Sequence, residues 1–285
     1  MSRLFAVVFM LVLAQTNANA GTLLLTGDTW TYGAVFSSGT SLELDNTGNR
    51  PVKGTLAADY SSRQIMWSKG YEIRLNENME VMSGYIAAGK QLIHSLELKP
   101  LTEASVHENG QLRAFSIGSI GMIGGGKYTV AADSFIVTYN NGSVRGAKLL
   151  NDFDFQCPGS GKSFQFYKGE VSFYPDPLGK TANQLGVGAV RTARLRRDHV
   201  NNGETIPANS IITLNERGDV IGIICVTQFF FKRISLPSGG VIELMPSGIF
   251  SVSADQDVMI NGKTYPSFKQ VFVDLNGQVI STAPK

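Results

Sequence analysis

The sequence predicts an all-β fold of tandem antiparallel β-hairpin repeats, arranged as an elongated sheet or in a solenoid-like way. Three observations predict it. Apolar and polar residues alternate with a period of two along most of the chain, as they do in half-buried strands. No helical face is longer than two turns. A strand-turn-strand pattern centred on Asn-Gly or a related glycine pair returns about every 30 residues, which is the mark of a repeat architecture.

The first twenty residues have the features of a cleavable secretory signal. Arg3 precedes eleven apolar residues, 4–14, and the small residues Ala18 and Ala20 close a short polar stretch. Eleven residues form a helix of about 17 Å, much shorter than the roughly 30 Å hydrocarbon core of a bilayer. We therefore expect cleavage near Ala20 and export to the periplasm or the medium. The rest, 21–285, is expected to be a single hairpin-repeat domain without a transmembrane helix.

Hairpins follow one another from residue 42 onward. An Asn-Gly pair between alternating runs indicates a hairpin, because the central residues of its turn must tolerate positive φ. Copies are predicted at 42–56, 73–82, 104–113, 135–147, 211–221, 242–251 and 271–280. Their turn positions 48, 79, 110, 142, 218, 248 and 277 are spaced 31, 31, 32, 76, 30 and 29 residues apart. The gap of 76 is two periods, so a degenerate copy is predicted near 171–179, where Pro175-Asp176-Pro177 is typical of a turn.

A second glycine-bearing link separates successive hairpins. It is predicted at 84–89, 124–129, 159–163, 202–203, 239–240 and 261–262. A β-sandwich or a barrel is the alternative fold, since its turns also come about every 8–12 residues. The even spacing favours the repeat, in which each unit buries its apolar face against its neighbours.

The unit of strand, Asn-Gly, strand and Gly-Lys-x-Tyr/Phe link resembles the MORN-like tandem hairpin repeats of exported bacterial envelope proteins. The resemblance covers residues 35–282. It implies an elongated antiparallel sheet or coil of hairpins that serves as a scaffold or ligand surface, and it implies no catalytic residue. The aromatic-glycine spacing of true MORN repeats is absent from this chain.

The charge balance argues against nucleic acid as a partner. The chain has 25 Lys and Arg against 23 Asp and Glu, and removing Arg3 with the signal leaves 24 against 23, a net charge of +1. No cofactor site is predicted either. Residues 121–127 fit the first seven positions of a phosphate-binding loop, but the eighth is Tyr128 rather than Ser or Thr.

The three histidines do not form a recognisable site. His94, His107 and His199 lie far apart in the sequence. A structural zinc site needs clustered ligands, and a triad needs partners that a lone histidine does not define. No catalytic or metal-binding residue is predicted from the sequence.

Cys157 and Cys225 are candidates for a disulfide. In an oxidising compartment two cysteines can pair, and a loop of this length would be stabilised by roughly 4 kcal/mol in the chain-entropy model. The alternative is that both are buried thiols that pack as small apolar residues.

Four arginines form a basic cluster at Arg191, Arg194, Arg196 and Arg197. Guanidinium groups suit the carboxylate and phosphate groups of an acidic partner or a glycan, so the cluster is a candidate anion- or partner-binding site. The alternative is an edge strand that its charges protect from aggregation.

Three adjacent aromatic residues occupy 229–231. Neighbouring residues of a strand face opposite sides, so at least one of these rings must point away from any single core face. Burial on both faces and a partner-binding patch are both compatible with that pattern.

Together these features favour a non-enzymatic binding or scaffold module at the bacterial cell envelope, with an envelope protein or a glycan as its partner. The alternative is an exported hydrolase that acts on an envelope or extracellular polymer. The alternative predicts a polar cleft in which a histidine lies beside a carboxylate.

Overall fold

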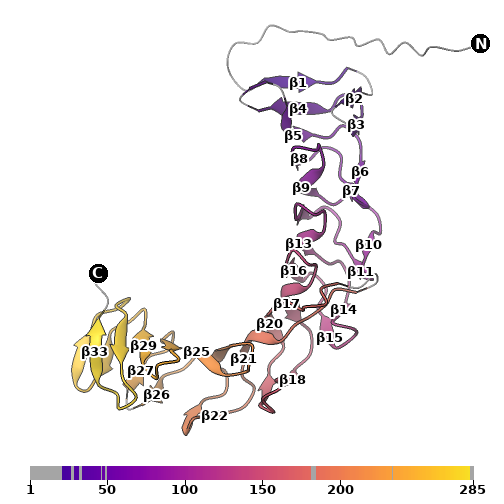
Figure 1. Ribbon diagram of the computed structural model, residues 1–285. Coiled ribbons are helices and arrows are strands. Elements are labelled where there is room, and N and C mark those ends of the chain that lie inside the picture. The colour runs from indigo at the N-terminus through magenta and orange to yellow at the C-terminus, as the bar shows by residue number, and fades with distance from the viewer. Residues whose placement is uncertain are drawn as a thin grey trace, which may run out of the picture. The chain divides into compact units, whose positions relative to one another are not determined.

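The computed structural model describes residues 21–26, 29–31, 34–45, 47–48, 50–180, 184–232 and 234–282. Over these residues the protein is all-β and has no helix (Figure 1). The predicted signal, 1–20, lies outside the described residues. The chain divides into two compact units, Met1–Ala87 and Ala88–Lys285, called unit 1 and unit 2 below.

Unit 1 contains a main sheet and two smaller hairpins. The main-sheet strands are β1 (Thr22–Leu24), β4 (Ser41–Leu44), β5 (Pro51–Thr55), β8 (Glu72–Leu75) and β9 (Val81–Tyr85). They pair antiparallel in chain order. The smaller hairpins are β2 (Thr29–Thr31) with β3 (Ala34–Phe36), and β6 (Tyr60–Ser62) with β7 (Ile65–Trp67).

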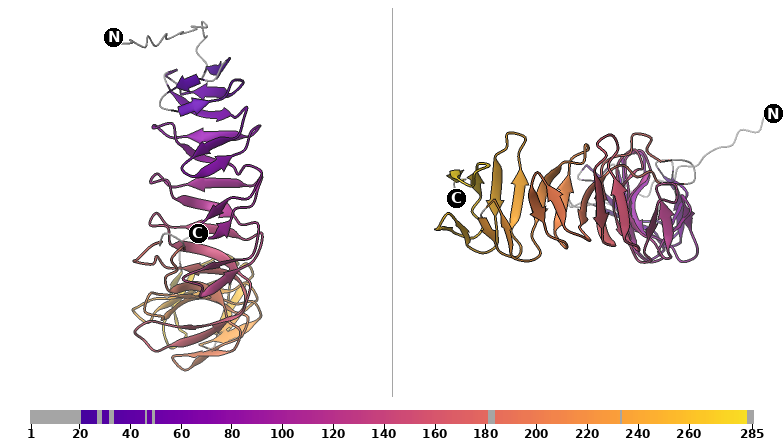
Figure 2. Two further views of the ribbon diagram at one scale, coloured as in Figure 1. Left: turned by 90° about the vertical axis from the view of Figure 1, so that its right-hand side faces the viewer. Right: turned by 90° about the horizontal axis from the view of Figure 1, so that it is seen from below.

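Unit 2 continues the pattern with six main hairpins. Their strands are β12 (Glu103–Val106), β13 (Leu112–Ser116), β16 (Phe135–Thr138), β17 (Val144–Leu149), β20 (Gly169–Phe173), β21 (Val190–Arg194), β24 (Ile211–Leu214), β25 (Val220–Ile224), β28 (Val241–Leu244), β29 (Phe250–Ser253), β32 (Val271–Val273) and β33 (Val279–Thr282). Each strand from β13 to β32 pairs antiparallel with both of its neighbours in this series. Figure 2 shows successive hairpins of unit 2 stacked side by side.

A second set of hairpins alternates with the main ones along unit 2. Its strands are β10 (Leu92–Ile93), β11 (Leu96–Glu97), β14 (Gly121–Ile123), β15 (Tyr128–Val130), β18 (Phe153–Gln156), β19 (Ser163–Phe166), β22 (His199–Asn201), β23 (Glu204–Ile206), β26 (Phe229–Phe231), β27 (Ile234–Leu236), β30 (Val258–Ile260) and β31 (Lys263–Tyr265). The last four form one four-stranded sheet. Each repeat is thus a main hairpin and a second hairpin, and the predicted fold of tandem hairpins is confirmed.

The main hairpins share one turn. In each, the residue at the fourth turn position has a positive φ and its N–H donates to the carbonyl three residues earlier, as between Gly218 and Asn215 at 3.0 Å. The side chain of Asn215 also accepts from the N–H of Arg217 at 2.9 Å. A β-bulge follows in most copies, for example at Thr213/Leu214. Together they form a type I turn with a glycine bulge, which explains why glycine recurs at this position.

The predicted degenerate copy is present. Strands β20 and β21 form its hairpin, and the N–H of Gly179 donates to the carbonyl of Asp176 at 2.9 Å across the turn. The chain then takes an additional loop through residues 184–189 before β21 begins at Val190. The copy therefore divides the gap of 76 residues into intervals of 37, from Gly142 to Gly179, and 39, from Gly179 to Gly218.

The second glycine-bearing link has two different structures. At 124–126, 159–161, 202–203 and 261–262 it is the tip of a second hairpin, and these residues include positive φ values. Gly239-Gly240 instead lies in the turn that leads from β27 to β28, and 84–89 runs from the end of β9. Two-residue tips with both φ values positive also occur at Arg63-Gln64 and His94-Ser95, where no glycine marks them.

A third turn precedes seven of the eight described main hairpins at a fixed distance; before the β20–β21 copy the positive φ is at Gly169, ten residues before Gly179. Positive φ values occur at Gly39, Gly70, Leu101, Asp133, Asn209, Gly239 and Phe268. Each lies nine residues before the turn position at 48, 79, 110, 142, 218, 248 or 277. In these seven copies the nine-residue offset is the same although the residue type at the third turn varies, so the backbone path repeats.

The core lies between the main strands and the second hairpins. Phe231 of β26 packs edge-on against Phe250 of β29, with ring centres 5.3 Å apart. Tyr128 of β15 packs against Phe173 of β20 at 5.4 Å. The rings of Phe231, Phe250 and Phe173 are buried. The apolar members of both hairpin sets therefore face each other, and their other faces carry the exposed residues.

Candidate functional site

The predicted arginine cluster lies at and beyond the end of β21. Arg191 and Arg194 belong to the strand, whereas Arg196 and Arg197 follow it, and all but the half-buried Arg196 are exposed. The interpretation of this segment as a protected edge strand is wrong. Residue Thr192 of β21 pairs with β20 on one side and with β24 on the other.

The arginines contact different partners. The guanidinium of Arg191 lies 5.7 Å from the ring centre of Tyr174, and the Nε of Arg194 donates to a backbone carbonyl at 3.2 Å. Arg196 forms ion pairs with Asp154 at 3.2 Å and Asp152 at 3.7 Å. An anion site formed jointly by the four residues stays a prediction, and Arg196 already has acidic partners within its own repeat.

Both cysteines are buried and free. Cys157 lies at the end of β18, and its side chain packs beside the turn glycine Gly218. Cys225 follows β25, and burial raises the pKa of its thiol to about 11. The two thiols are held in different repeats, each packed as a small apolar side chain, which is the alternative that the sequence left open.

We expect neither thiol of the native protein to react with a thiol reagent near pH 8, because both are buried and Cys225 is protonated at that pH. Adding denaturant without reductant should make both cysteines reactive. The measurement is a colorimetric thiol titration before and after unfolding. A titration that finds no thiol after unfolding would instead demonstrate the disulfide.

The three histidines lie on different hairpins. His94 is at the tip of β10–β11 with a φ of 49°. The Nε2 of His107 lies 3.2 Å from the carbonyl oxygen of Thr138, and the ring of His199 packs 4.5 Å from that of Phe164. Burial lowers the pKa of His107 and of His199 because it disfavours the charged imidazolium. The structure therefore does not bring the three histidines together.

The three adjacent aromatics divide between the two faces of β26. Phe229 and Phe231 are buried, whereas Phe230 is 66% exposed. The prediction that one ring points away from the core is confirmed, and that ring is Phe230. It borders the feature described next.

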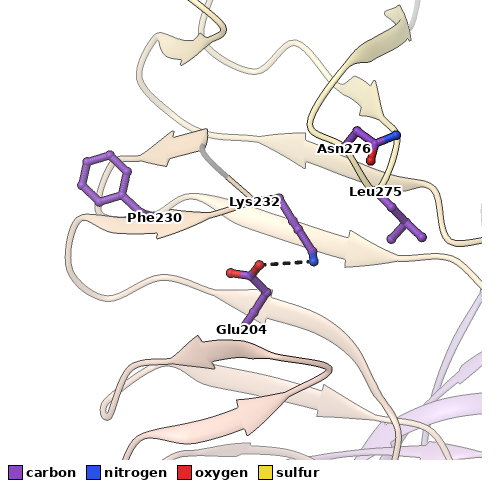
Figure 3. Close-up of a pocket in the computed structure, with 5 residues that line it drawn as sticks. All are labelled: Glu204, Phe230, Lys232, Leu275 and Asn276. Atoms are coloured by element: carbon purple, nitrogen blue, oxygen red, sulfur yellow. Dashed lines mark ion pairs between the residues drawn. The ribbon is translucent and has the colours of Figure 1, made fainter.

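A hollow of about 570 Å³ opens on the surface of unit 2 (Figure 3). It is lined by Glu204 of β23, Phe230 of β26, Lys232 at the tip of β26–β27, and Leu275 and Asn276 in the β32–β33 turn. Three repeats contribute to it, although the residues span more than 70 positions of the sequence.

The lining of the hollow combines a charged pair, one amide and two apolar side chains. The Nζ of Lys232 lies 3.2 Å from a carboxylate oxygen of Glu204, and both side chains are only partly exposed. Figure 3 shows Lys232 reaching to Glu204 of the preceding second hairpin. Leu275 is 60% exposed. The arrangement offers one cation, one anion, the amide of Asn276 and two apolar surfaces to a ligand.

Gly277 allows the β32–β33 turn to pack closely beside this hollow. Gly277 has a φ of 83°, and a Cβ there would lie 2.8 Å from the carbonyl oxygen of Lys232. The carbonyl of Gly277 accepts from the Nδ2 of Asn261 at 2.7 Å. The turn therefore packs against the tips of two second hairpins, and this close approach places Leu275 and Asn276 at the rim.

A strip in which large apolar residues alternate with hydroxyl residues extends from Phe230 across the four-stranded sheet. Phe230 pairs with Ser235, Ser235 with Met259, and Met259 with Thr264, so these four residues lie in one row on the outer face. Met259 is 58% exposed. Two large exposed apolar side chains therefore lie in one row beside the hollow, with Ser235 between them.

No group of three or more His, Cys, Asp or Glu residues in the described part of the chain is arranged to hold a metal ion. The described residues form no helix, and so none that is long and apolar enough to cross a membrane. In comparisons with known proteins, no family model, curated protein or solved structure matches the chain.

The sequence indicated only part of this site. The alternation within 229–231 predicted that at least one ring points away from any single core face, and the Asn-Gly pair predicted the turn that holds Asn276. Nothing in the sequence marked Glu204 and Lys232 as a pair. Their proximity depends on how successive second hairpins stack, which residue patterns within one hairpin do not reveal.

Proposed function

We propose that this chain is an exported, non-enzymatic binding or scaffold module of the bacterial cell envelope. The observation that supports the proposal best is the hollow with the adjoining strip of Phe230 and Met259. Aromatic and methionine side chains are enriched in protein interfaces, and methionine adapts its shape to varied partners. Repeat proteins commonly use such surfaces for binding.

The partner that fits this surface is a segment of an envelope protein. Phe230 and Met259 offer apolar contact, while Glu204 and Lys232 already satisfy each other and can exchange partners with an acidic or basic group of the ligand. Such charged groups at the border of an apolar patch select the partner more than they add affinity. A glycan is the other partner class, and the experiment below separates the two.

The test is site-specific photo-cross-linking in cells that produce the full chain. A photoreactive phenylalanine analogue is introduced at Phe230, and in a separate variant at Phe135, which is also on a strand and 54% exposed. We expect a discrete adduct with an envelope protein from position 230 that is absent from position 135. Mass spectrometry of the adduct identifies the partner.

Two results would argue against the proposal. Identical adducts from both positions would show contact without specificity. The absence of an adduct from either position would show that the hollow does not bind a partner. An adduct at position 230 whose added mass is removed by glycosidases would favour a glycan as the ligand.

A further inference from the structure

Three arginines lie at equivalent positions on the outer face of the main sheet in unit 2. In each main hairpin from β12–β13 to β20–β21 a bulge follows the turn, and there two residues of the second strand face one residue of the first. Both of these residues lie between buried neighbours and point outward. The more exposed of the two is Arg113 on β13, Arg145 on β17 and Arg191 on β21. These three residues are called the arginine row below.

The arginine row is evenly spaced. Strands β13, β16, β17, β20 and β21 pair in this order (Figure 1), so one strand lies between each two arginines. Neighbouring strands are about 4.8 Å apart, and the arginine positions therefore follow one another at about 10 Å. Beside them runs a parallel row with no side chain larger than valine, formed by the Cα-paired residues Ala114, Val137, Gly146, Ser172 and Thr192. A long ligand can thus lie close to the sheet along the arginines.

These five strands carry a local excess of positive charge. Their charged residues are all exposed. They are Arg113, Arg145, Lys148, Arg191 and Arg194 against the single acidic residue Glu170. The whole chain has 25 basic and 23 acidic residues, which leaves 20 basic and 22 acidic residues outside these strands. Solvated surfaces normally intersperse the two signs, so this face attracts anions although the chain is nearly neutral.

The same face of unit 1 shows the ordinary arrangement. There the Nζ of Lys53, next to the bulge of β5, lies 3.0 Å from a carboxylate oxygen of Glu43 and 3.7 Å from one of Glu72. In unit 2 the arginine row has no ion pair with any of the described residues. Arg191 contacts only the ring of Tyr174 by its charge. The three guanidinium groups are therefore open to an outside anion.

We propose that the arginine row binds a linear acidic polysaccharide, which crosses strands β13 to β21 with one carboxylate at each guanidinium. Guanidinium groups donate paired hydrogen bonds to carboxylates. A sugar unit is about as long as the spacing of neighbouring strands, so a polymer with an acidic group on every second sugar matches the row. An extended acidic peptide does not match it, because side chains on one face of a strand recur at about 7 Å.

This inference goes beyond the proposed function, since it assigns a second surface and another class of partner. The test is binding of labelled hyaluronan, which carries one carboxylate on every second sugar, to the full purified chain and two triple variants. The row variant combines Arg113→Gln, Arg145→Gln and Arg191→Gln. The matched control removes three charges from exposed positions of unit 2 outside these strands, by Arg197→Gln, Arg217→Gln and Lys263→Gln. Dextran, which is neutral, and polyglutamate, an acidic peptide, are the comparison ligands.

We expect hyaluronan to bind the unmodified chain and the control variant alike. The row variant should bind it roughly tenfold more weakly, because three exposed ion pairs each contribute little. Dextran should not bind, and polyglutamate should bind more weakly than hyaluronan. Absence of hyaluronan binding would overturn the proposal, and so would equal losses in the two variants, which would indicate attraction by net charge alone. Dextran or polyglutamate binding as tightly as hyaluronan would overturn the acidic polysaccharide as the ligand.

A second measurement uses the unmodified chain and so serves if the row variant does not fold. Bound hyaluronan should protect the arginine row from phenylglyoxal, a reagent for exposed guanidinium groups, while Arg197 and Arg217 stay reactive. Mass spectrometry of peptides locates the modified residues. Equal modification of the row with and without hyaluronan would contradict the proposal.

The two proposals fail separately. The hollow is formed by second hairpins and the β32–β33 turn, so cross-linking at position 230 reports on the hollow alone. Position 135 lies on β16 on the same face as the arginine row, and a glycan adduct there is compatible with both proposals.

Discussion

Replacing Phe173 by Ala should lower the free energy of unfolding of unit 2 by about 3–5 kcal/mol. The ring of Phe173 is fully buried on β20 and packs against Tyr128. Its removal leaves a cavity between the main sheet and a second hairpin, where close packing allows little collapse. In a unit of this size the loss corresponds to a fall of roughly 10 °C in the unfolding midpoint.

The matched control is Phe230→Ala. Phe230 is also on a strand of unit 2 but 66% exposed, so its replacement should change stability by no more than about 0.5 kcal/mol. Urea unfolding followed by circular dichroism measures both. Equal effects of the two substitutions would mean that the hairpin layers do not enclose the core described above.

Gly218→Ala is expected to lower the free energy of unfolding by about 2–5 kcal/mol, for two separate reasons. Gly218 has a φ of 76°, which strains any residue with a Cβ by about 1–2 kcal/mol. That Cβ would also lie 2.7 Å from the Cβ of the buried Cys157, and overpacking costs about 1–3 kcal/mol. The turn of one repeat and the thiol of another are thus sterically coupled.

The variant Gly203→Ala separates the backbone strain from the steric contact. Gly203 has a φ of 81°, but nothing lies within 4 Å of a Cβ placed there. Only the backbone strain of about 1–2 kcal/mol should remain. Chemical denaturation of both variants gives the difference directly. If Gly218→Ala lowers the free energy of unfolding no more than Gly203→Ala does, Cys157 moves away from the new Cβ without loss of stability.

The sequence predicted the main hairpins because their turns depend on local chemistry. Asn-Gly pairs and the repeating interval located even the degenerate copy, whose turn ends at Gly179. The second hairpins were harder to predict. The tip at His94-Ser95 adopts positive φ without glycine, so tertiary packing rather than residue preference determines its turn.

The interpretation of β21 as a protected edge failed for a related reason. Charged residues at Arg191 and Arg194 suit both an edge strand and the solvent-facing side of an interior strand. Only the pairing with β20 and β24 distinguishes the two cases. The ion pair of Glu204 with Lys232 was likewise beyond the sequence, because it joins neighbouring hairpins.

The constant nine-residue offset between the third turn and the main turn has a consequence for how this chain can change in length. Because this part of the backbone path is the same in seven of the eight described copies, the strands that these repeats offer to one another are similarly placed. Loss or duplication of one whole unit of about 30 residues would therefore leave matching strands at the new junction. The insertion before β21 shows that extra loop residues are accommodated between repeats as well. The number of repeats, and with it the extent of the outer surface, is a quantity that evolution can adjust without redesigning the fold.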